Sequence, residues 1–158
     1  MWFGYTFNNS NYFFENISTD KFPSNYNVKH SLNSGISYEI IDGFSISMAY
    51  NWRTGRPYNK PVEGEETFMD GNFIKVNYGA PNSHSLPNYS RLDGSLSYAI
   101  ELSKEKSLTV KAGILNILNK ENIIDRYYRV SDENQSEAEE INVTSLKFTP
   151  NASLQFRF

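Results

Sequence analysis

The stretch SLKFTPNASLQFRF, residues 145–158, alternates strictly between two kinds of residue. Counting back from Phe158, every second residue lies on one side of the stretch, and the residues between them are polar. The first set is Phe158, Phe156, Leu154, Ala152, Pro150, Phe148 and Leu146. Because successive side chains of a strand point to opposite faces, this alternation predicts a long β-strand with one apolar face. Pro150 has no N–H to donate, so it suits the margin of a strand or a bulge.

Five earlier stretches alternate in the same way, and helical periodicity is scarce along the chain. These stretches cover residues 1–7, 28–39, 44–53, 92–100 and 108–114. The segment IIDRYYRV, residues 123–130, is a possible continuation of the fifth stretch. The sequence therefore predicts an all-β chain of about six strands.

The connections between these stretches alternate between long and short. Long polar segments follow the first, third and fifth stretches, whereas IDG and ELSKEKS follow the second and fourth. In an antiparallel up-and-down sheet, this alternation puts the long loops at one end and the tight turns at the other, beside the C-terminus. Short periplasmic turns and long extracellular loops are typical of outer-membrane β-barrels.

Alternation alone does not separate a membrane barrel from a soluble β-sandwich, because strands of both are half-buried. Three features favour the barrel. The polar sides are rich in Ser, Asn, Gly and Ala and carry little charge, unlike most sandwich exteriors. Aromatic residues make up 15% of the chain, and several, such as Tyr50, Trp52 and Tyr98, lie near strand ends, as in interfacial girdles. The charged residues collect in the loops.

Composition excludes several classes of function. The formal net charge of -3 gives no basic field for nucleic acid, and the lack of cysteine leaves no disulfide or thiolate site. The chain has no apolar run near the roughly 18 residues that a membrane helix needs. Met1 is followed directly by WFGYTF without an export signal, so we expect either a cytoplasmic protein or a piece of a longer one.

Three segments of the chain resemble, in order and spacing, the C-terminal end of TonB-dependent outer-membrane receptors. They are LPNYSRLDGSLSYAI (86–100), LTVKAGILNILNKENIIDRYY (108–128) and FTPNASLQFRF (148–158). Upstream, NWRTGRPYNKP (51–61) looks like the passage that precedes the RLD-type strand of that family. The resemblance covers most of the chain and is strongest from Leu86 onward.

Individual residues match the motifs of that family. Arg91, Leu92 and Asp93 match its RLD-type strand, and NILN at Asn116–Asn119 matches the N-[LI]-x-N motif that ends its next strand. Phe158 matches the aromatic residue that ends its last strand. The resemblance implies that residues 1–158 are the C-terminal part of a receptor barrel: an antiparallel up-and-down transmembrane segment with about six strands of a barrel of roughly 22.

The resemblance also implies a function and partners. It implies import of a scarce nutrient, such as a siderophore, cobalamin, glycan or peptide, across the outer membrane of a Gram-negative bacterium. The implied partners are outer-membrane lipid, the remaining barrel and plug of the same receptor, and TonB, which acts through the plug. A further implied partner is the barrel-insertion machinery. Leu154, Phe156 and Phe158 match the signal that this machinery recognises. Ala152 and Pro150 depart from the preference of the signal for bulkier residues.

One cluster of polar residues is a candidate ligand site. Arg53, Arg56, Tyr58 and Lys60 lie where the third stretch passes into the longest loop. They suit an anionic or sugar-like ligand, held by charge-assisted hydrogen bonds and aromatic stacking. The alternative is that the two arginines anchor the loop or pair with lipopolysaccharide phosphates or carboxylates of the wall.

No residue set points to catalysis. His30 and His84 are the only histidines and have no ligand spacing around them, and no nucleophile motif or phosphate-binding glycine loop occurs. We therefore predict no enzymatic activity, no cofactor, no metal site and no nucleic-acid partner. The alternative function is that of a soluble or surface-attached β-sandwich that binds carbohydrate through its Tyr, Trp and Asn side chains.

Overall fold

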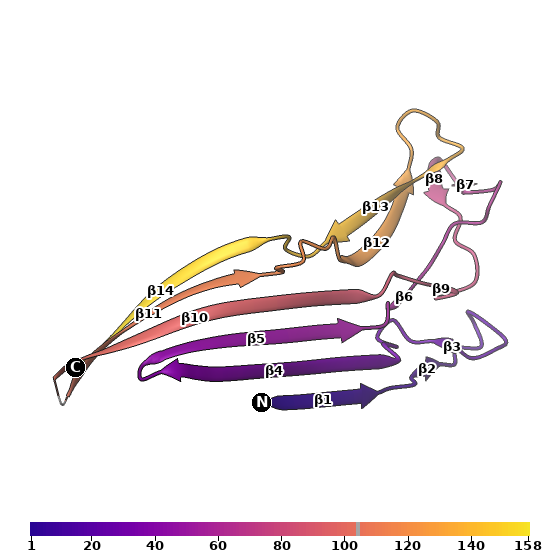
Figure 1. The fold of residues 1–158 in the computed structure, drawn as a ribbon. Coiled ribbons are helices and arrows are strands. Elements are labelled where there is room, and N and C mark those ends of the chain that lie inside the picture. The colour runs from indigo at the N-terminus through magenta and orange to yellow at the C-terminus, as the bar shows by residue number, and fades with distance from the viewer. Residues whose placement is uncertain (104) are drawn as a thin grey trace.

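A computed structural model describes residues 1–103 and 105–158, and its regular elements are all β-strands. Six of them form one antiparallel sheet in the order β1-β4-β5-β10-β11-β14. Their bounds are β1 Trp2–Phe7, β4 His30–Ile41, β5 Phe44–Arg53, β10 Tyr89–Ser103, β11 Lys106–Leu115 and β14 Thr149–Arg157. Figure 1 shows them as a single curved layer. The predicted all-β class and the six alternating stretches are confirmed.

The connections of the sheet lie as the sequence predicts. The β4–β5 turn, the end of β10 and the start of β11 lie at the same end as the C-terminus, and the three long loops lie at the other end (Figure 1). In the β4–β5 turn, Gly43 takes a φ of 76°, a conformation that favours glycine, and its N–H donates to Glu39 Oε1 at 3.0 Å. The sheet is therefore an up-and-down meander with distinct loop and turn ends.

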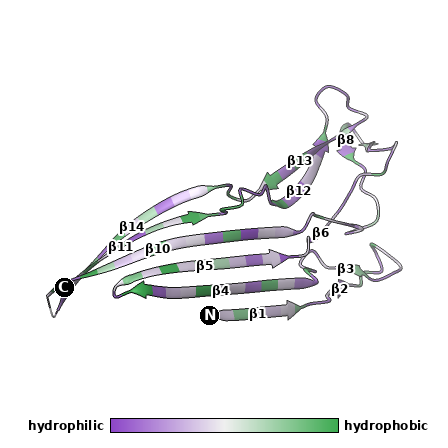
Figure 2. Ribbon diagram, viewed as in Figure 1, coloured by the Kyte–Doolittle hydropathy of each residue, from purple (hydrophilic) through white to green (hydrophobic). Residues whose placement is uncertain are grey.

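Cross-strand register puts most of the apolar residues of the six strands on one face. Directly paired residues of antiparallel strands share a face. One apolar row consists of Tyr38, Ile46, Leu96, Ala112 and Ala152. The row beside it, on the opposite face, consists of Ser37, Ser47, Ser95, Gly113 and Asn151. Figure 2 shows the resulting alternation of hydropathy along the strands.

The apolar face is uncovered by any described element. Tyr38, Leu96, Tyr98, Leu154 and Phe156 are all exposed large side chains on this face. Among the described residues the only buried hydrophobic residue is Leu86, which is 5% exposed and lies in a loop. A sandwich core would require a second layer over this face, and the described chain supplies none. The part of the chain that the structure describes contains no helix long and apolar enough to cross a membrane.

The fifth strand does not continue through residues 123–130, so the continuation considered above is wrong. β11 ends at Leu115, and Asn116 and Asn119 then take positive φ values of 54° and 50°. Such residues break an extended strand, and Asn tolerates this conformation better than most side chains. Residues Ile123–Val130 instead form β12, which pairs with β13 (Ala138–Thr144). The last strand begins at Thr149, so residues 145–148 of the predicted strand lie outside it, and Pro150 is near its margin as expected.

The long loops contain short strand pairs that the sequence did not predict. They are β2 (Asn11–Tyr12) with β3 (Phe22–Pro23), β6 (Pro57–Tyr58) with β9 (His84–Ser85), and β7 (Thr67–Asp70) with β8 (Phe73–Val76). Two of the loop hairpins touch. Thr67 Oγ1 donates to the Gln135 carbonyl at 2.8 Å, and Ala138 N donates to Glu66 Oε2 at 2.7 Å. Hydrogen bonds therefore connect the loop that contains β7 and β8 to the β12–β13 hairpin, beyond the end of the sheet.

Candidate ligand-binding site

The residues of the RLD segment and of the NILN segment form one hydrogen-bonded network at the loop end of the sheet. Arg91 donates to Asp93 Oδ2 through Nε at 3.0 Å and Nη2 at 2.7 Å. The other oxygen of Asp93 accepts the backbone N–H of Asn116 at 2.9 Å. The Asn116 side chain, which is 0% exposed, donates to the carbonyls of Lys120 at 2.9 Å and Leu146 at 3.0 Å. The network links β10, the end of β11 and the segment before β14.

Neighbouring residues extend the network. Phe148 N donates to Asn119 Oδ1 at 3.0 Å, which ties the motif to the start of the last strand. Asn122 bonds both backbone groups of Ser90, donating to its carbonyl at 2.9 Å and accepting its N–H at 2.9 Å. All these bonds satisfy backbone or buried groups, so these residues stabilise the ends of the strands and leave little free for a ligand.

The four predicted site residues do not converge on one point. Arg53 belongs to the polar face of the sheet, where its Cζ lies 4.8 Å from the ring centroid of Tyr89. Arg56 Nη2 forms an ion pair with Asp125 Oδ1 at 2.5 Å. Tyr58 accepts a hydrogen bond from Arg126 Nη1 at 3.1 Å. Lys60 is exposed, and its carbonyl accepts Gly79 N–H at 2.9 Å.

Arg56 and Tyr58 nevertheless line a common hollow, which we call the loop cavity. Its volume is about 320 Å³, and it lies between the segment around Asn25, the β5–β10 loop and β12. Its lining includes Tyr26, Tyr58, Asn59, Asn82, Asp125 and Tyr127. Arg53 and Lys60 do not line it. The structure thus joins two of the four predicted residues in one site, and ligand binding there stays a prediction.

The β12 side of the loop cavity is held by a dense polar cluster. The Arg126 guanidinium lies 5.1 Å from the Tyr58 ring centroid, and its Nη2 pairs with Glu140 Oε1 at 3.0 Å. Tyr128 donates to the other oxygen of Glu140 at 3.0 Å. Burial raises the pKa of Tyr128, and the hydrogen bond to Glu140 and its negative charge raise it further. Tyr128 therefore stays protonated, as a donor to Glu140, over the whole neutral range.

Sequence reasoning missed Asp125, Arg126 and Asn82. Asp125 and Arg126 lie in a stretch that was interpreted as a possible strand continuation. The two adjacent opposite charges in that stretch were the only sequence feature that could have marked them as site residues. Asn82 is 7% exposed with a φ of 53°, and its Nδ2 donates to Pro23 O at 2.8 Å and Asn25 Oδ1 at 2.6 Å. These contacts join segments 57 or more residues apart, and no local pattern encodes them.

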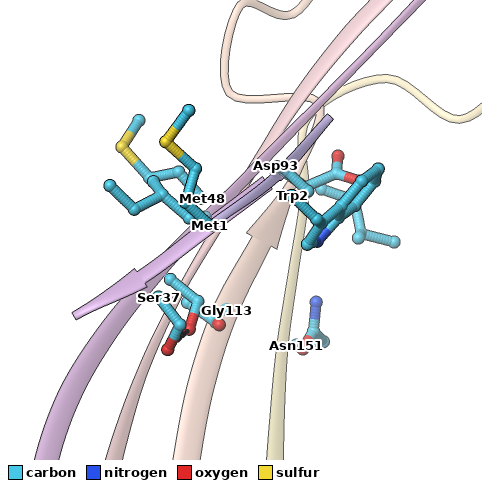
Figure 3. A pocket seen from close by; sticks show the side chains of 13 residues that line it. Met1, Trp2, Ser37, Met48, Asp93, Gly113 and Asn151 are labelled. Atoms are coloured by element: carbon cyan, nitrogen blue, oxygen red, sulfur yellow. Dashed lines mark hydrogen bonds between the residues drawn. The ribbon is translucent and has the colours of Figure 1, made fainter. Parts of the chain in front are cut away.

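The polar face of the sheet has a separate hollow of about 380 Å³, which we call the sheet hollow (Figure 3). Figure 3 shows Met48 on one side of the strands and Trp2 on the other, as the register requires. Trp2 lies against Gly35, where an added Cβ would come 2.5 Å from the indole Nε1. The polar lining of the sheet hollow consists of Asp93, Asn151 and the three serines Ser37, Ser47 and Ser95. Small residues thus let an aromatic side chain lie flat on the polar face.

The residues of the proposed insertion signal lie on the apolar face. Leu154 pairs with Val110, and Phe156 pairs with Leu108. The rings of Phe156 and Phe158 are 5.8 Å apart, and all three signal residues are exposed. Their exposure is compatible with contact to a partner or to lipid. Within the described residues no group of three or more acidic, His or Cys side chains could hold a metal ion.

Comparisons with known proteins add no relative. No model of a protein family, no curated protein and no solved structure matches the chain.

Proposed function

We propose that residues 1–158 form part of the wall of an outer-membrane β-barrel, as the C-terminal segment of a TonB-dependent receptor that imports a scarce nutrient. One observation supports this proposal above the others. A mainly apolar face runs across six antiparallel strands, no described element covers it, and the opposite face is rich in Ser, Asn and Gly. Lipid-facing and lumen-facing residues alternate in this way in barrel walls.

The energetics of the apolar face favour a lipid environment. In water, leaving apolar surface exposed forfeits about 25 cal/mol for each Å² that burial would remove from solvent. Hydrocarbon chains in contact with this face remove that penalty. The edge strands β1 and β14 also present unpaired backbone groups, which have no place in lipid unless further strands pair with them. The proposal therefore includes additional barrel strands beside both edges.

Each part of the chain has a role in this proposal. The polar face lines the barrel interior next to the plug, and the loops face the outside of a Gram-negative bacterium. Leu154, Phe156 and Phe158 engage the barrel-insertion machinery before the strands meet outer-membrane lipid. TonB acts on the plug and does not touch this segment. The segment itself binds and transports, and performs no catalysis.

The soluble carbohydrate-binding sandwich is the less favoured function. It requires a second layer over the apolar face, and the described strands form one layer there. The loop cavity, with its Tyr and Asn lining, suits either function and does not separate them.

The proposal is tested by placing tryptophan probes on the two faces of β10. Trp2 and Trp52 are first replaced by Phe, and then either Leu96 or its neighbour Ser97 is replaced by Trp. After reconstitution in vesicles, lipids with brominated chains should quench the Leu96→Trp fluorescence strongly and the Ser97→Trp fluorescence weakly. Equal quenching of the two probes, or quenching of neither, would refute the membrane-wall proposal.

A further inference from the structure

The charges around the loop cavity are balanced. Arg56 is paired with Asp125 at 2.5 Å, and Arg126 is paired with Glu140 at 3.0 Å. Arg126 also donates through Nε to Asn142 Oδ1 at 2.8 Å and through Nη1 to Tyr58. An anionic ligand would have to displace or approach these carboxylates, and like charges at close range repel it. The paired guanidinium groups therefore make the cavity a poor site for an anion.

The cavity does present neutral hydrogen-bonding groups. Asn59 and Asn25 use their oxygens to accept from Asn82, through the backbone N–H and Nδ2, each at 2.6 Å. The Nδ2 groups of Asn59 and Asn25 have no hydrogen-bond partner among the described residues, and the same holds for the hydroxyls of Tyr26 and Tyr127. Because Asn82 fixes both amides, their free donors are held in place before any ligand arrives.

Two aromatic rings are open for stacking. Tyr58 is already engaged by Arg126 and by His84, whose ring centroid lies 5.8 Å away. Tyr26 and Tyr127, by contrast, are 76% and 50% exposed. Tyrosine offers a flat apolar surface with a polar tip and loses little conformational entropy when it binds. A volume of about 320 Å³ is at the lower end of the range of ligand sites.

We infer that the loop cavity binds a neutral polyhydroxylated ligand, a pyranose unit of an oligosaccharide. The C–H face of a sugar ring packs on Tyr127, and the sugar hydroxyls accept from the free Asn59 and Asn25 amides. The inference rests on the proposed function, since that function places the loops on the ligand-accepting side, and it narrows the imported nutrient to a glycan.

Direct binding tests the inference. The full chain is purified in lauryldimethylamine oxide, a detergent without a sugar head group, and titrated by calorimetry with maltohexaose, mannohexaose and xylohexaose. Citrate and inorganic phosphate serve as anionic probes. We expect at least one oligosaccharide to bind and neither anion to bind. Asp125→Asn, which releases Arg56 from its ion pair, should create binding of citrate that the unaltered chain lacks.

Variants locate the site. Tyr127→Ala and Asn59→Ala should each weaken oligosaccharide binding by at least about tenfold, because each removes a group that contacts sugar. Both side chains are exposed, although Asn59→Ala also removes the acceptor of the Asn82 backbone N–H, and circular dichroism verifies that each variant keeps the fold. The matched control is Phe73→Ala, an exposed aromatic residue of β8 outside the cavity, which should bind as the unaltered chain does.

Three results would overturn the inference: binding of an anion without any oligosaccharide, binding of no probe, or oligosaccharide binding that Tyr127→Ala and Asn59→Ala leave intact. The brominated-lipid experiment is independent of these outcomes. A chain that is quenched by lipid but binds no sugar keeps the proposed function and loses the inference. A chain that binds sugar but shows no difference between its two faces keeps the sugar site in the loop cavity, loses the membrane-wall proposal, and with it loses the assignment of the sugar as an imported nutrient.

Discussion

Asn116 joins three separate parts of the chain through a single buried side chain. It donates to the carbonyls of Lys120 and Leu146, accepts Lys120 N–H at 3.2 Å and holds a positive φ of 54°. Truncation would leave two carbonyls without their donor in a site that water does not reach. Each unsatisfied buried group costs about 1–3 kcal/mol.

We therefore expect Asn116→Ala to lower the free energy of unfolding by at least about 2 kcal/mol. Urea unfolding in detergent, followed by tryptophan fluorescence, measures the change. Asn11→Ala is the control, since Asn11 is exposed and contacts only Asn9 at 3.5 Å; its effect should stay within about 0.5 kcal/mol. An Asn116→Ala midpoint equal to that of the control would contradict the role assigned to this residue.

Gly55 is required by a close approach of two backbone segments. A Cβ at this position would lie 1.6 Å from the carbonyl oxygen of Leu86, the buried loop residue, and Leu86 N donates to Arg56 O at 3.0 Å. Gly55→Ala should therefore separate the two segments and displace Arg56 and Tyr58 from the loop cavity. Limited proteolysis should cut the variant in the β5–β10 loop at a protease concentration that leaves the unaltered chain intact.

Gly79→Ala, in the same loop, is the control for this prediction. Its nearest contact would be Lys60 O at 3.4 Å, which is close to an ordinary van der Waals distance. The loop of this variant should resist proteolysis as the unaltered chain does. If Gly55→Ala resisted proteolysis as well as Gly79→Ala does, the close approach of the two segments would not be needed to hold the loop in place.

Adjacent residues of β10 lie on opposite faces of the sheet, so substitutions there compare the environments of the two faces. Leu96 lies on the apolar face opposite Ile46 and Ala112, while Ser97 lies on the polar face opposite Ser45 and Lys111. In lipid vesicles, Leu96→Arg should cost about 2–4 kcal/mol of unfolding free energy, because a charged group near the bilayer centre loses its hydration. Ser97→Arg should cost less than about 1 kcal/mol. Urea titration of the reconstituted variants measures both, and equal costs would exclude lipid contact for this face.

Ionisation of Tyr128 should reduce the stability of the β12–β13 hairpin at high pH. Burial raises the pKa of Tyr128 and Glu140 adds to the shift, so its folded value lies above the unfolded value near 10. A group with a raised pKa contributes stability that is complete below the unfolded pKa and is lost as pH rises through the folded pKa. The hairpin should therefore be insensitive to pH in the neutral range and loosen only in strong alkali.

The ultraviolet absorbance of tyrosinate measures this ionisation among the 11 tyrosines of the chain. Alkaline titration should show a late step that Tyr128→Phe removes. If the late step persists in Tyr128→Phe, another tyrosine is responsible and the assignment to the Glu140 contact is wrong.

The molecule as a whole has no enclosed core among its described residues, since Leu86 is the buried hydrophobic residue. The exposed apolar face and the two edge strands both favour association in water. We expect the purified chain to elute as aggregates or mixed oligomers without detergent and as a single species in detergent. Size-exclusion chromatography with light scattering measures this. A single monomeric species in plain buffer, with cooperative thermal unfolding, would contradict the membrane-wall proposal.

The six strands, their faces and the two ends of the sheet followed from the sequence. The face on which a side chain lies depends on its position in an extended backbone, so Phe44, Ile46 and Met48 could be assigned without a structure. The alternation of long and short connections then placed the loops. The face of a side chain and the length of a connection are local properties of the chain, so a sequence pattern can predict them.

The residues that line the loop cavity come together only in the tertiary structure. Arg126 and Tyr58 are 68 residues apart, and Asp125 meets Arg56 only because β12 folds back against the β5–β10 loop. The sequence pointed to Arg56 and Tyr58 by their chemistry, and the ion pair of Arg56 with Asp125 agrees with the alternative that this arginine anchors the loop. The position of its carboxylate partner, in β12, could not be read from the sequence. Such contacts depend on how whole segments dock after the strands have paired, and docking is set by the summed packing of many residues.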